Sequence, residues 1–411
     1  MNIMLIVKSM AIECLGPQHL QSIAKQAGHK CRIVALDDAL AVAAAYKPDL
    51  VGYSVLTGDQ ERFVALNDAL KQKHDFLSVF GGSHASFFPK DFDRDNINLI
   101  IPGEAENEWS ELLGSDKRYP DLDSIPWPDR ADFQDRPIRD FIASRGCTNS
   151  CAYCYNSAWN EMYPELSKIR YRSAVDVVNE VASVQPQFAY FQDSNFGVSL
   201  KWLRLFSWEY GKKVRIPFHA HLRPNMVTPE RVSLLSDAGC VSVKIALETA
   251  SSRLRKLINR GKSNNEDVYA AARLLKRECI ALIMLNILGL PTATIEEDLE
   301  TLAVNIKCHP AYAWSSIFQP YPSTPLANYC EKEGIYNGDY SEISDNFFDK
   351  SVLNLTDEHK EQVACLQRIF AFCVEMQVMP TVEDLTWERL PKFIHDAMRK
   401  SGDRKMFPGI L

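Results

Sequence analysis

The sequence lacks any apolar run long enough to cross a membrane. The longest such run, "ALIMLNILGLP" at residues 281–291, is too short to span a bilayer and is typical of a buried strand. The first residues lack the basic segment, long apolar stretch and small-residue cleavage site of a secretory signal. We therefore expect a cytoplasmic protein without a membrane span.

An excess of positive charge is also missing. The 411 residues carry a formal net charge of -7, which argues against a general nucleic-acid-binding protein. The basic stretch "RLRKLINRGK" at 253–262 is a local candidate for binding an anion. No G-x-G-x-x-G motif is present, so the usual signature of a dinucleotide site is absent.

Cysteine is not scarce, since the chain has 11. An odd number without a secretory signal fits a reducing compartment, in which some thiols bind metal and the others are buried.

Two different alternations of strand and helix patterns divide the chain. Residues 1–113 carry apolar runs separated by helical patterns, which predicts a doubly wound parallel sheet. Residues 114–137 are rich in proline and aspartate and read as a linker. Residues 138–335 hold six further strand patterns, which predicts a partial (β/α)6 barrel. Residues 336–411 are mainly helical, either as a lid over the substrate or as a plain helical cap.

The predicted strands are short apolar runs. In the first domain they are "NIMLIV", "CRIVAL", "LVGYSV", "FLSVFGG" and "NLIIPG", and in the barrel they are "FIASRG", "FAYFQDS", "FHAHLR", "SVKIALE", "ALIMLNILG" and "WSSIFQPY". The fold class that follows is α/β, with a Rossmann-like domain ahead of the barrel.

The stretch "SRGCTNSCAYCYN" places Cys147, Cys151 and Cys154 within one loop. Thiolates at such spacings are typical ligands of iron-sulfur clusters. Structural zinc usually takes four Cys or His ligands, and no fourth lies nearby in the sequence. Three thiolates on a [4Fe-4S] cluster leave one iron open to bind another molecule. A zinc site and three unrelated surface cysteines are the alternatives.

This C-x3-C-x2-C pattern, with Tyr153 before the last cysteine and a predicted strand before the first, resembles the radical S-adenosylmethionine (SAM) superfamily. In that family the open iron binds SAM, and an electron from the cluster cleaves SAM to a 5'-deoxyadenosyl radical. The resemblance implies that the three cysteines are the catalytic cluster ligands. It also implies an external electron donor of the flavodoxin or ferredoxin type.

Further segments resemble the same family in the expected order. The resemblance implies SAM contacts at Tyr153, Asp193, Asn195, Arg223, Glu248, Gly289 and Pro291. For Asp193 the alternative is a turn that caps a helix, and for Glu248 it is an ion pair at a strand end. His219, His221 and Tyr321 are the candidate substrate contacts. The two histidines share a strand face because they are two residues apart, but packing alone is the other reading.

Three loops of the first domain resemble those of the cobalamin-binding domain that precedes the barrel in one radical SAM subfamily. They follow the third, fourth and fifth predicted strands, where ligands of doubly wound sheets bind. The resemblance covers roughly residues 1–335. The predicted cobalamin contacts are Ser54, Leu56, Thr57, Gly58, Gly81, Gly82, Ser83, His84, Gly103 and Glu104.

One departure concerns the ligand of cobalt. Many cobalamin-binding domains carry D-x-H-x-x-G, whose histidine ligates cobalt, and this motif is absent here. Either cobalamin binds without a protein histidine on cobalt, or the domain is a vestigial, empty one. His84 is read as a loop contact and not as a cobalt ligand.

The resemblance implies a cobalamin-dependent methyltransferase that acts on an unactivated carbon. In the family, methylcobalamin holds the methyl group, and the radical abstracts hydrogen from a small-molecule or peptide substrate. One alternative is a lyase, cyclisation or ring rearrangement that uses cobalamin as a redox partner or not at all. Another is an iron-sulfur or cobalamin sensor.

Overall fold

The computed structural model describes residues 1–134, 136–343 and 346–400, which form two compact units. The first unit consists of Met1–Thr148, Asn160–Asp193 and Lys201–Phe218, and the second of Asn149–Trp159, Ser194–Leu200 and the chain from His219. The domain limits at 113, 137 and 335 stay predictions. Residues 401–411 of the predicted C-terminal region lie outside the described residues.

Five parallel strands form the sheet of the first unit. Their order is β2-β1-β3-β4-β5, the order of flavodoxin-like doubly wound folds. The prediction of a doubly wound parallel sheet is therefore confirmed. The strands are β1 (Asn2–Val7), β2 (Lys30–Ala35), β3 (Leu50–Ser54), β4 (Leu77–Gly81) and β5 (Leu99–Ile100).

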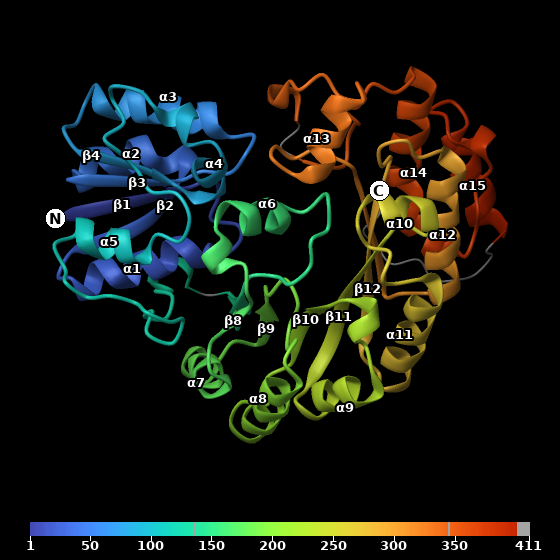
Figure 1. The fold of residues 1–411 in the computed structure, drawn as a ribbon, viewed down its shortest axis with the longest axis horizontal. Helices are drawn as coiled ribbons and strands as arrows, with labels where there is room; N and C mark the ends of the chain where they lie inside the picture. The colour runs from blue at the N-terminus through green and yellow to red at the C-terminus, as the bar shows by residue number, and fades with distance from the viewer. Residues whose placement is uncertain (135, 344–345, 401–411) are drawn as a thin grey trace. The chain divides into compact units, whose positions relative to one another are not determined.

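Helices cover both faces of this sheet. Ile3 and Leu5 of β1 pack toward α1 (Leu15–Gln26) and α5 (Glu106–Leu112), on the face drawn below the sheet in Figure 1. Met4 and Ile6, the alternate residues of β1, share a core with α2 (Ala39–Tyr46) and α3 (Gln60–Lys71) on the other face. A strand buried on both faces reads as an unbroken apolar run, which is why the sequence revealed it.

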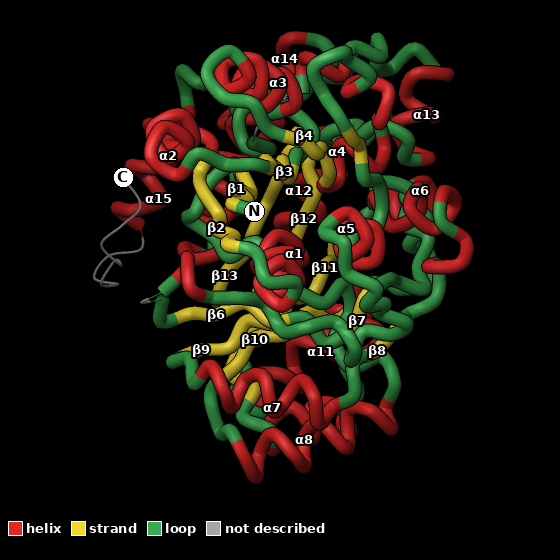
Figure 2. Tube along the Cα trace, turned by 90° about the vertical axis from the view of Figure 1, so that its left-hand side faces the viewer, coloured by secondary structure: helices red, strands yellow, loops and turns green. Residues whose placement is uncertain are grey.

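The first unit also contains the start of the second sheet. Strand β9 is packed by an aromatic core, in which the Phe191 ring lies 5.6 Å from the rings of Phe206 and Phe218. Figure 2 shows α7 and α8 side by side at the lower edge of the view. The elements are β6 (Ile138–Phe141), β7 (Ser144–Arg145), β8 (Arg170–Tyr171), α7 (Ala174–Val184), β9 (Phe188–Phe191) and α8 (Leu200–Lys213).

The second sheet has the strand order β13-β12-β11-β10-β9-β6, with parallel pairing of β11 with β12 and of β12 with β13. The six predicted strands thus form one curled half-barrel sheet. Its remaining strands are β10 (Phe218–Leu222), β11 (Cys240–Glu248), β12 (Ala281–Leu288) and β13 (Tyr312–Ile317).

One strand of this sheet was predicted at the wrong residues. The sequence placed the first barrel strand at "FIASRG", residues 141–146, but β6 ends at Phe141, and β7 pairs with β8 in a separate antiparallel pair. The charged residues Arg139 and Asp140 interrupt the apolar pattern that would have indicated a strand at these residues. Both bind Glu13, which accepts from the Arg139 side chain at 2.8 Å and from the Asp140 backbone at 2.7 Å.

Helices cover the outer face of the half-barrel in the second unit. Val363 and Phe370 of α14 (Asp357–Met376) pack with Ala313 and Ile317 of β13 and with Leu302 of α12 (Ile295–Cys308). Figure 1 shows α12 and α14 side by side. The other helices named below are α10 (Ser252–Leu257) and α11 (Asn265–Arg277). In the described part of the chain, no helix is both long and apolar enough to cross a membrane.

Candidate active site

The cysteine loop contains the boundary between the two units. Cys147 belongs to the first unit, and Cys151 and Cys154 belong to the second. Cys147 and Cys151 are buried, and Cys154 is half-buried. Among the described residues, no three His, Cys, Asp or Glu side chains are grouped closely enough to hold a metal ion. The assignment of the three thiols to one cluster therefore stays a prediction.

Nitrogen donors surround the two sulfurs of the second unit. Arg223 Nη1 donates to Cys151 Sγ at 3.4 Å, and Arg260 Nη1 does so at 3.7 Å. Asn156 Nδ2 donates to Cys154 Sγ at 3.6 Å. Cationic and N–H donors stabilise a thiolate, the form of cysteine that binds iron. The donor set thus fits cluster-bound sulfur.

Backbone hydrogen bonds within the second unit fix the loop around Cys151. The backbone N–H of Ala152 donates to Ile258 O at 3.0 Å, and its carbonyl accepts from Leu326 N at 2.8 Å. The side chain of Asn259 donates to Ser150 O at 2.7 Å. The segment that follows α10 therefore holds this loop in place.

Tyr153, Glu248 and Arg260 form a buried polar cluster beside Cys151. The Tyr153 hydroxyl donates to Glu248 Oε1 at 2.5 Å and accepts from Arg260 Nη1 at 3.2 Å. Arg260 Nη1 also lies 3.8 Å from Glu248 Oε1. Glu248 has a left-handed φ of 64°, which turns the chain at the end of β11. The structure thus brings together two predicted SAM contacts, Tyr153 and Glu248.

The protonation of this cluster follows from burial and charge. Burial, together with the charge of Glu248, raises the pKa of Tyr153 well above its usual value, so the hydroxyl stays a donor. Burial would lower the pKa of Arg260, but Tyr153, Glu248 and Cys151 outweigh it and raise that pKa. The guanidinium is therefore a fixed positive charge next to a cysteine sulfur.

Arg260 was not among the predicted site residues. The only signal in the sequence was the basic stretch 253–262, which contains it. The predicted alternative for Glu248, an ion pair at a strand end, also describes part of what is seen, because Arg260 is its buried partner.

Asp193 is engaged within the first unit. Its carboxylate accepts from the backbone N–H of Ala143 at 3.0 Å and from the hydroxyl of Ser144 at 2.5 Å. Burial raises the pKa of Asp193 to about 6. These bonds tie the end of β9 to the segment before the cysteine loop. Asn195 is buried in the second unit.

Gly289 and Pro291 lie in a tight turn after β12. Gly289 has a φ of 62°, and its N–H donates to Asp298 Oδ2 of α12 at 2.9 Å. A Cβ at Gly289 would lie 3.1 Å from Val363 Cγ1. The turn is therefore held against two helices of the second unit.

Asp298 makes stability depend on pH. Burial raises its pKa from 3.8 to about 7, so the unfolded chain loses this proton at a lower pH than the folded chain. The folded state is penalised increasingly as pH rises from about 4 to about 7. Asp298→Asn keeps an acceptor for Gly289 and should raise the free energy of unfolding at pH 8 by on the order of 2 kcal/mol.

Urea unfolding at pH 5 and at pH 8 measures this effect. The gain should be larger at pH 8, and Asp75→Asn, at an exposed position, should show no such difference. An equal effect of Asp298→Asn at both pH values would show that the carboxyl of the folded protein does not change its protonation between pH 5 and pH 8.

The candidate substrate residues lie in the second unit. His219 and His221 both belong to β10, and their rings are 5.3 Å apart. His219 Nδ1 is hydrogen-bonded to Ser242 Oγ at 2.7 Å. Tyr321 is half-buried, and its carbonyl accepts from the Thr324 hydroxyl at 2.7 Å.

The loops predicted to bind cobalamin follow β3, β4 and β5 in the first unit. His84 is occupied on both ring nitrogens, by Thr57 Oγ1 at 3.2 Å and by Asp91 Oδ2 at 3.1 Å. Leu56, which lies between Val55 and Thr57, is 49% exposed. Ser54 and Gly81 are the last residues of β3 and β4, and Gly58 lies in the loop after β3. Ser83 and His84 lie in the short helix α4 (Gly82–Phe87), which follows β4 directly in place of the predicted loop.

Two ion pairs hold the loop after β5 in place. The carboxylate of Glu104 accepts from Arg145 and from Arg170, each at 3.0 Å. Gly103 has a φ of 77°, and its N–H donates to Ser86 Oγ at 2.9 Å. Glu104 is thus neutralised within the first unit.

Gly82, the first residue of α4, permits a close approach to Val55 in the segment after β3. Its φ is 90°, and a Cβ at this position would lie 2.7 Å from Val55 N and 2.8 Å from Val55 O. Gly82→Ala should therefore lower the free energy of unfolding by about 3 kcal/mol, through clash and backbone strain. Chemical denaturation measures this loss.

Gly16→Ala is the matched control. Gly16 lies in α1 with nothing within 4 Å of its added Cβ, so alanine should be neutral or slightly stabilising. If Gly82→Ala were as stable as the wild type, the backbone at Val55 would have to shift away from the added Cβ without any cost in free energy.

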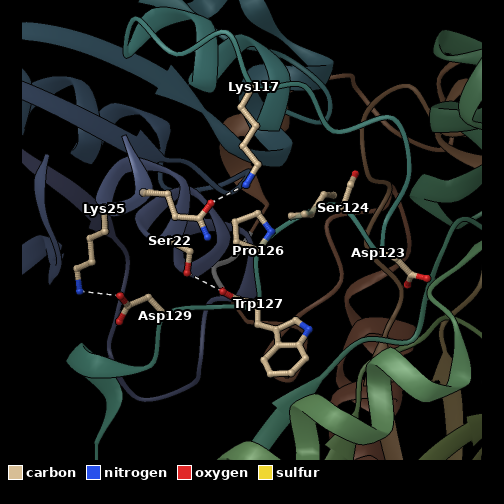
Figure 3. Close-up of a pocket in the computed structure, with 10 residues that line it drawn as sticks. Ser22, Lys25, Lys117, Asp123, Ser124, Pro126, Trp127 and Asp129 are labelled. Atoms are coloured by element: carbon tan, nitrogen blue, oxygen red, sulfur yellow. Dashed lines mark hydrogen bonds and ion pairs between the residues drawn. The ribbon is translucent and has the colours of Figure 1, made fainter. Parts of the chain in front are cut away.

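A pocket of about 530 Å³ lies elsewhere in the first unit (Figure 3). It is lined by α1 and the segment 117–129. Lys25 pairs with Asp129 at 2.7 Å, and Lys117 donates to Gln26 at 2.8 Å. None of the predicted site residues lines it.

Comparison with known proteins supports the assignment that was made from the cysteine loop and the half-barrel sheet. Residues 141–304 match the family model of the radical SAM superfamily. Residues 141–304 therefore form a radical SAM domain. The predicted resemblance is confirmed, and the sensor alternative is set aside.

Two solved structures share the fold of this chain. One is the radical SAM methyltransferase TsrM from Kitasatospora setae, solved with cobalamin and a [4Fe-4S] cluster bound. It is 15% identical with a TM-score of 0.67, over 98% of this chain and 100% of that chain. The other is OxsB, a cobalamin-dependent SAM radical enzyme solved with aqua-cobalamin. It is 14% identical with a TM-score of 0.71, over 97% of this chain and 71% of that chain.

A curated relative is similar in sequence. The uncharacterized methyltransferase PH0819 of Pyrococcus horikoshii is 22% identical over 368 residues, which is 77% of the enzyme and 78% of the relative. The fold class of the enzyme, a doubly wound domain ahead of a radical SAM half-barrel, is the one predicted.

Proposed function

We propose that this radical SAM enzyme is a cobalamin-dependent methyltransferase that acts on an unactivated carbon. The observation that carries the proposal is the buried cluster of Tyr153, Glu248 and Arg260 beside Cys151. Support comes from TsrM, a methyltransferase of the same fold solved with cobalamin, a cluster and, in another structure, a SAM analogue. OxsB, also of this fold, has been solved with both cobalamin and SAM.

The predicted residues divide into four groups, for the cluster, SAM, cobalamin and the substrate. Cys147, Cys151 and Cys154 would hold the cluster, with electrons from a flavodoxin or ferredoxin type of donor. When bound, the three cofactors supply an electron, a carbon radical and a transferable methyl group. Tyr153, Asp193, Asn195, Arg223, Glu248, Gly289 and Pro291 would hold SAM.

Glu248 is suited to bind the ammonium group of an amino acid. It is only 6% exposed, and Oε1 already accepts from Tyr153, which fixes its orientation. A carboxylate held this way accepts further hydrogen bonds without first giving up water. Arg260 keeps the cluster of side chains near neutral before the ligand arrives.

The loops of the first unit would hold cobalamin. Gly82 and Gly103 have left-handed φ values of 90° and 77°, which set the course of the backbone in these segments. Because both nitrogens of His84 are engaged by Thr57 and Asp91, this histidine is not placed to ligate cobalt. His84 would therefore contact the cofactor's surroundings and would not be a ligand of cobalt.

Anaerobic reconstitution with iron, sulfide and cobalamin tests the proposal. The reduced enzyme should show cluster and corrin absorption and should cleave SAM to 5'-deoxyadenosine. With substrate, a methyltransferase forms both S-adenosylhomocysteine and 5'-deoxyadenosine. Formation of 5'-deoxyadenosine alone with product would favour a lyase, cyclisation or rearrangement, and retention of no corrin would contradict the cobalamin part.

A further inference from the structure

Among the described residues of the second unit, helices pack on one face of β11, β12 and β13 and leave the other face more exposed. Residues on the packed face, such as Val243, Met284 and Ala313, are at most 3% exposed. Apart from Cys240 and Glu248 at the two ends of β11, the alternate residues are half-buried or exposed, and Tyr312 and Trp314 are 51% and 36% exposed. Successive residues of a strand point to opposite faces, so these alternate side chains share the more exposed face.

The strand register sets these side chains in rows. Lys244 of β11 lies beside Ile283 of β12, which lies beside Tyr312 of β13. The next row on this face pairs Leu285 with Trp314. Neighbours in register on one face are in side-chain contact distance.

Aromatic rings extend this apolar surface. The ring of Trp314 lies 6.4 Å from that of Tyr312 and 5.4 Å from that of Phe348. Large exposed aromatic side chains gathered in one place mark a binding surface. The apolar face is Ile283, Leu285, Tyr312 and Trp314.

Basic side chains occupy the other side of the same face. His219 is hydrogen-bonded to Ser242, which precedes Lys244 by two residues and therefore points the same way. His221 shares the face with His219 for the same reason. The basic cluster is His219, His221 and Lys244.

Burial opposes the positive charge of two members of the basic cluster, and for His219 neighbouring positive charge adds to this effect. Burial, followed by the charges of His221 and Lys244, lowers the pKa of His219 to about 3. Burial also lowers the pKa of Lys244. An anion bound here would relieve both effects, because it stabilises the charged form of each base.

The basic cluster lies within reach of the candidate SAM site along a single strand. Glu248 is four residues after Lys244 on β11. At about 3.3 Å per residue, their Cα atoms are roughly 13 Å apart. A molecule of modest size can therefore reach from Lys244 toward Glu248.

Resting on the proposed methyl transfer, we infer that the substrate is a carboxylic acid with an aromatic or apolar body. Its carboxylate binds the basic cluster, and its body lies on the apolar face. One half-buried lysine beside two histidines suits a single negative charge, and the register places apolar side chains directly next to it. Lys244 thereby becomes a specificity-determining residue that the sequence did not single out.

Calorimetric titration of the reconstituted enzyme with indole-3-propionate, and with its neutral amide, tests the inference. The acid should bind at least about tenfold more tightly than the amide, as expected for one charge-assisted contact. Lys244→Met should remove that difference, and Lys244→Arg should keep it. Lys276→Met, at an exposed position on α11, is the charge-matched control and should behave as the wild type.

Equal affinities of acid and amide for the wild type would overturn the inference, as would an undiminished preference in Lys244→Met. Trp314→Ala should weaken acid and amide alike, and a loss confined to the acid would contradict the apolar face. The titrations contain no reductant, so they do not depend on SAM cleavage. If cleavage fails in its own assay while the acid preference holds, the proposed function falls and the binding face remains.

Discussion

Cys154→Ala is expected to remove the cluster and to reduce cleavage of SAM by at least about 1,000-fold, the scale seen when a central catalytic group is lost. The sulfur of Cys154 accepts from Asn156 Nδ2 at 3.6 Å and lies in the loop that follows Cys151. Alanine offers no ligand, and no spare cysteine stands near it in the sequence. Iron and sulfide content, visible absorption and 5'-deoxyadenosine yield measure the loss.

Cys279→Ala is the matched control for this experiment. Cys279 is an exposed thiol of the second unit, outside the cysteine loop, so its loss should leave iron content and cleavage unchanged. A Cys154→Ala protein that kept its cluster and its cleavage rate would remove Cys154 from the ligand set. The Asn156 contact would then be structural only.

Strands buried on both sides were the most predictable part of this fold. In β1 both alternating sets of side chains are covered by helices, so the sequence shows an apolar run that needs no knowledge of its partners. The spacing of the three cysteines is also a property of one short segment of the chain. Features of this kind depend on neighbours in the chain, and the sequence displays them directly.

Contacts between distant segments could not be predicted. Arg260 is 109 residues from Cys151, and only the course of β11 and α10 brings the two side chains together. Glu104 meets Arg170 across 66 residues, and Arg139 in β6 is neutralised by Glu13. In each case a charge looked free in the sequence because its partner was defined only by the folded chain.

Arg260→Met is expected to lower the free energy of unfolding by about 3–5 kcal/mol, the usual cost of removing one partner of a buried ion pair. Glu248 and Arg260 have side chains only 8% and 6% exposed, so water cannot replace the lost guanidinium. Methionine fills similar volume but donates nothing to Tyr153 or Cys151. Denaturant titration measures the change, and Arg277→Met, at an exposed ion pair, should alter stability by no more than about 0.5 kcal/mol.

Adding Glu248→Gln to the Arg260→Met variant separates the contribution of charge to stability from that of packing. If the loss in Arg260→Met comes from the uncompensated carboxylate of Glu248, making that side chain neutral should recover a large part of it. The double variant should then be more stable than the sum of the single changes predicts, by on the order of 2 kcal/mol. Strict additivity would show instead that Arg260 acts through its bonds to Tyr153 and the Ala246 carbonyl, and that its charge is not balanced by Glu248.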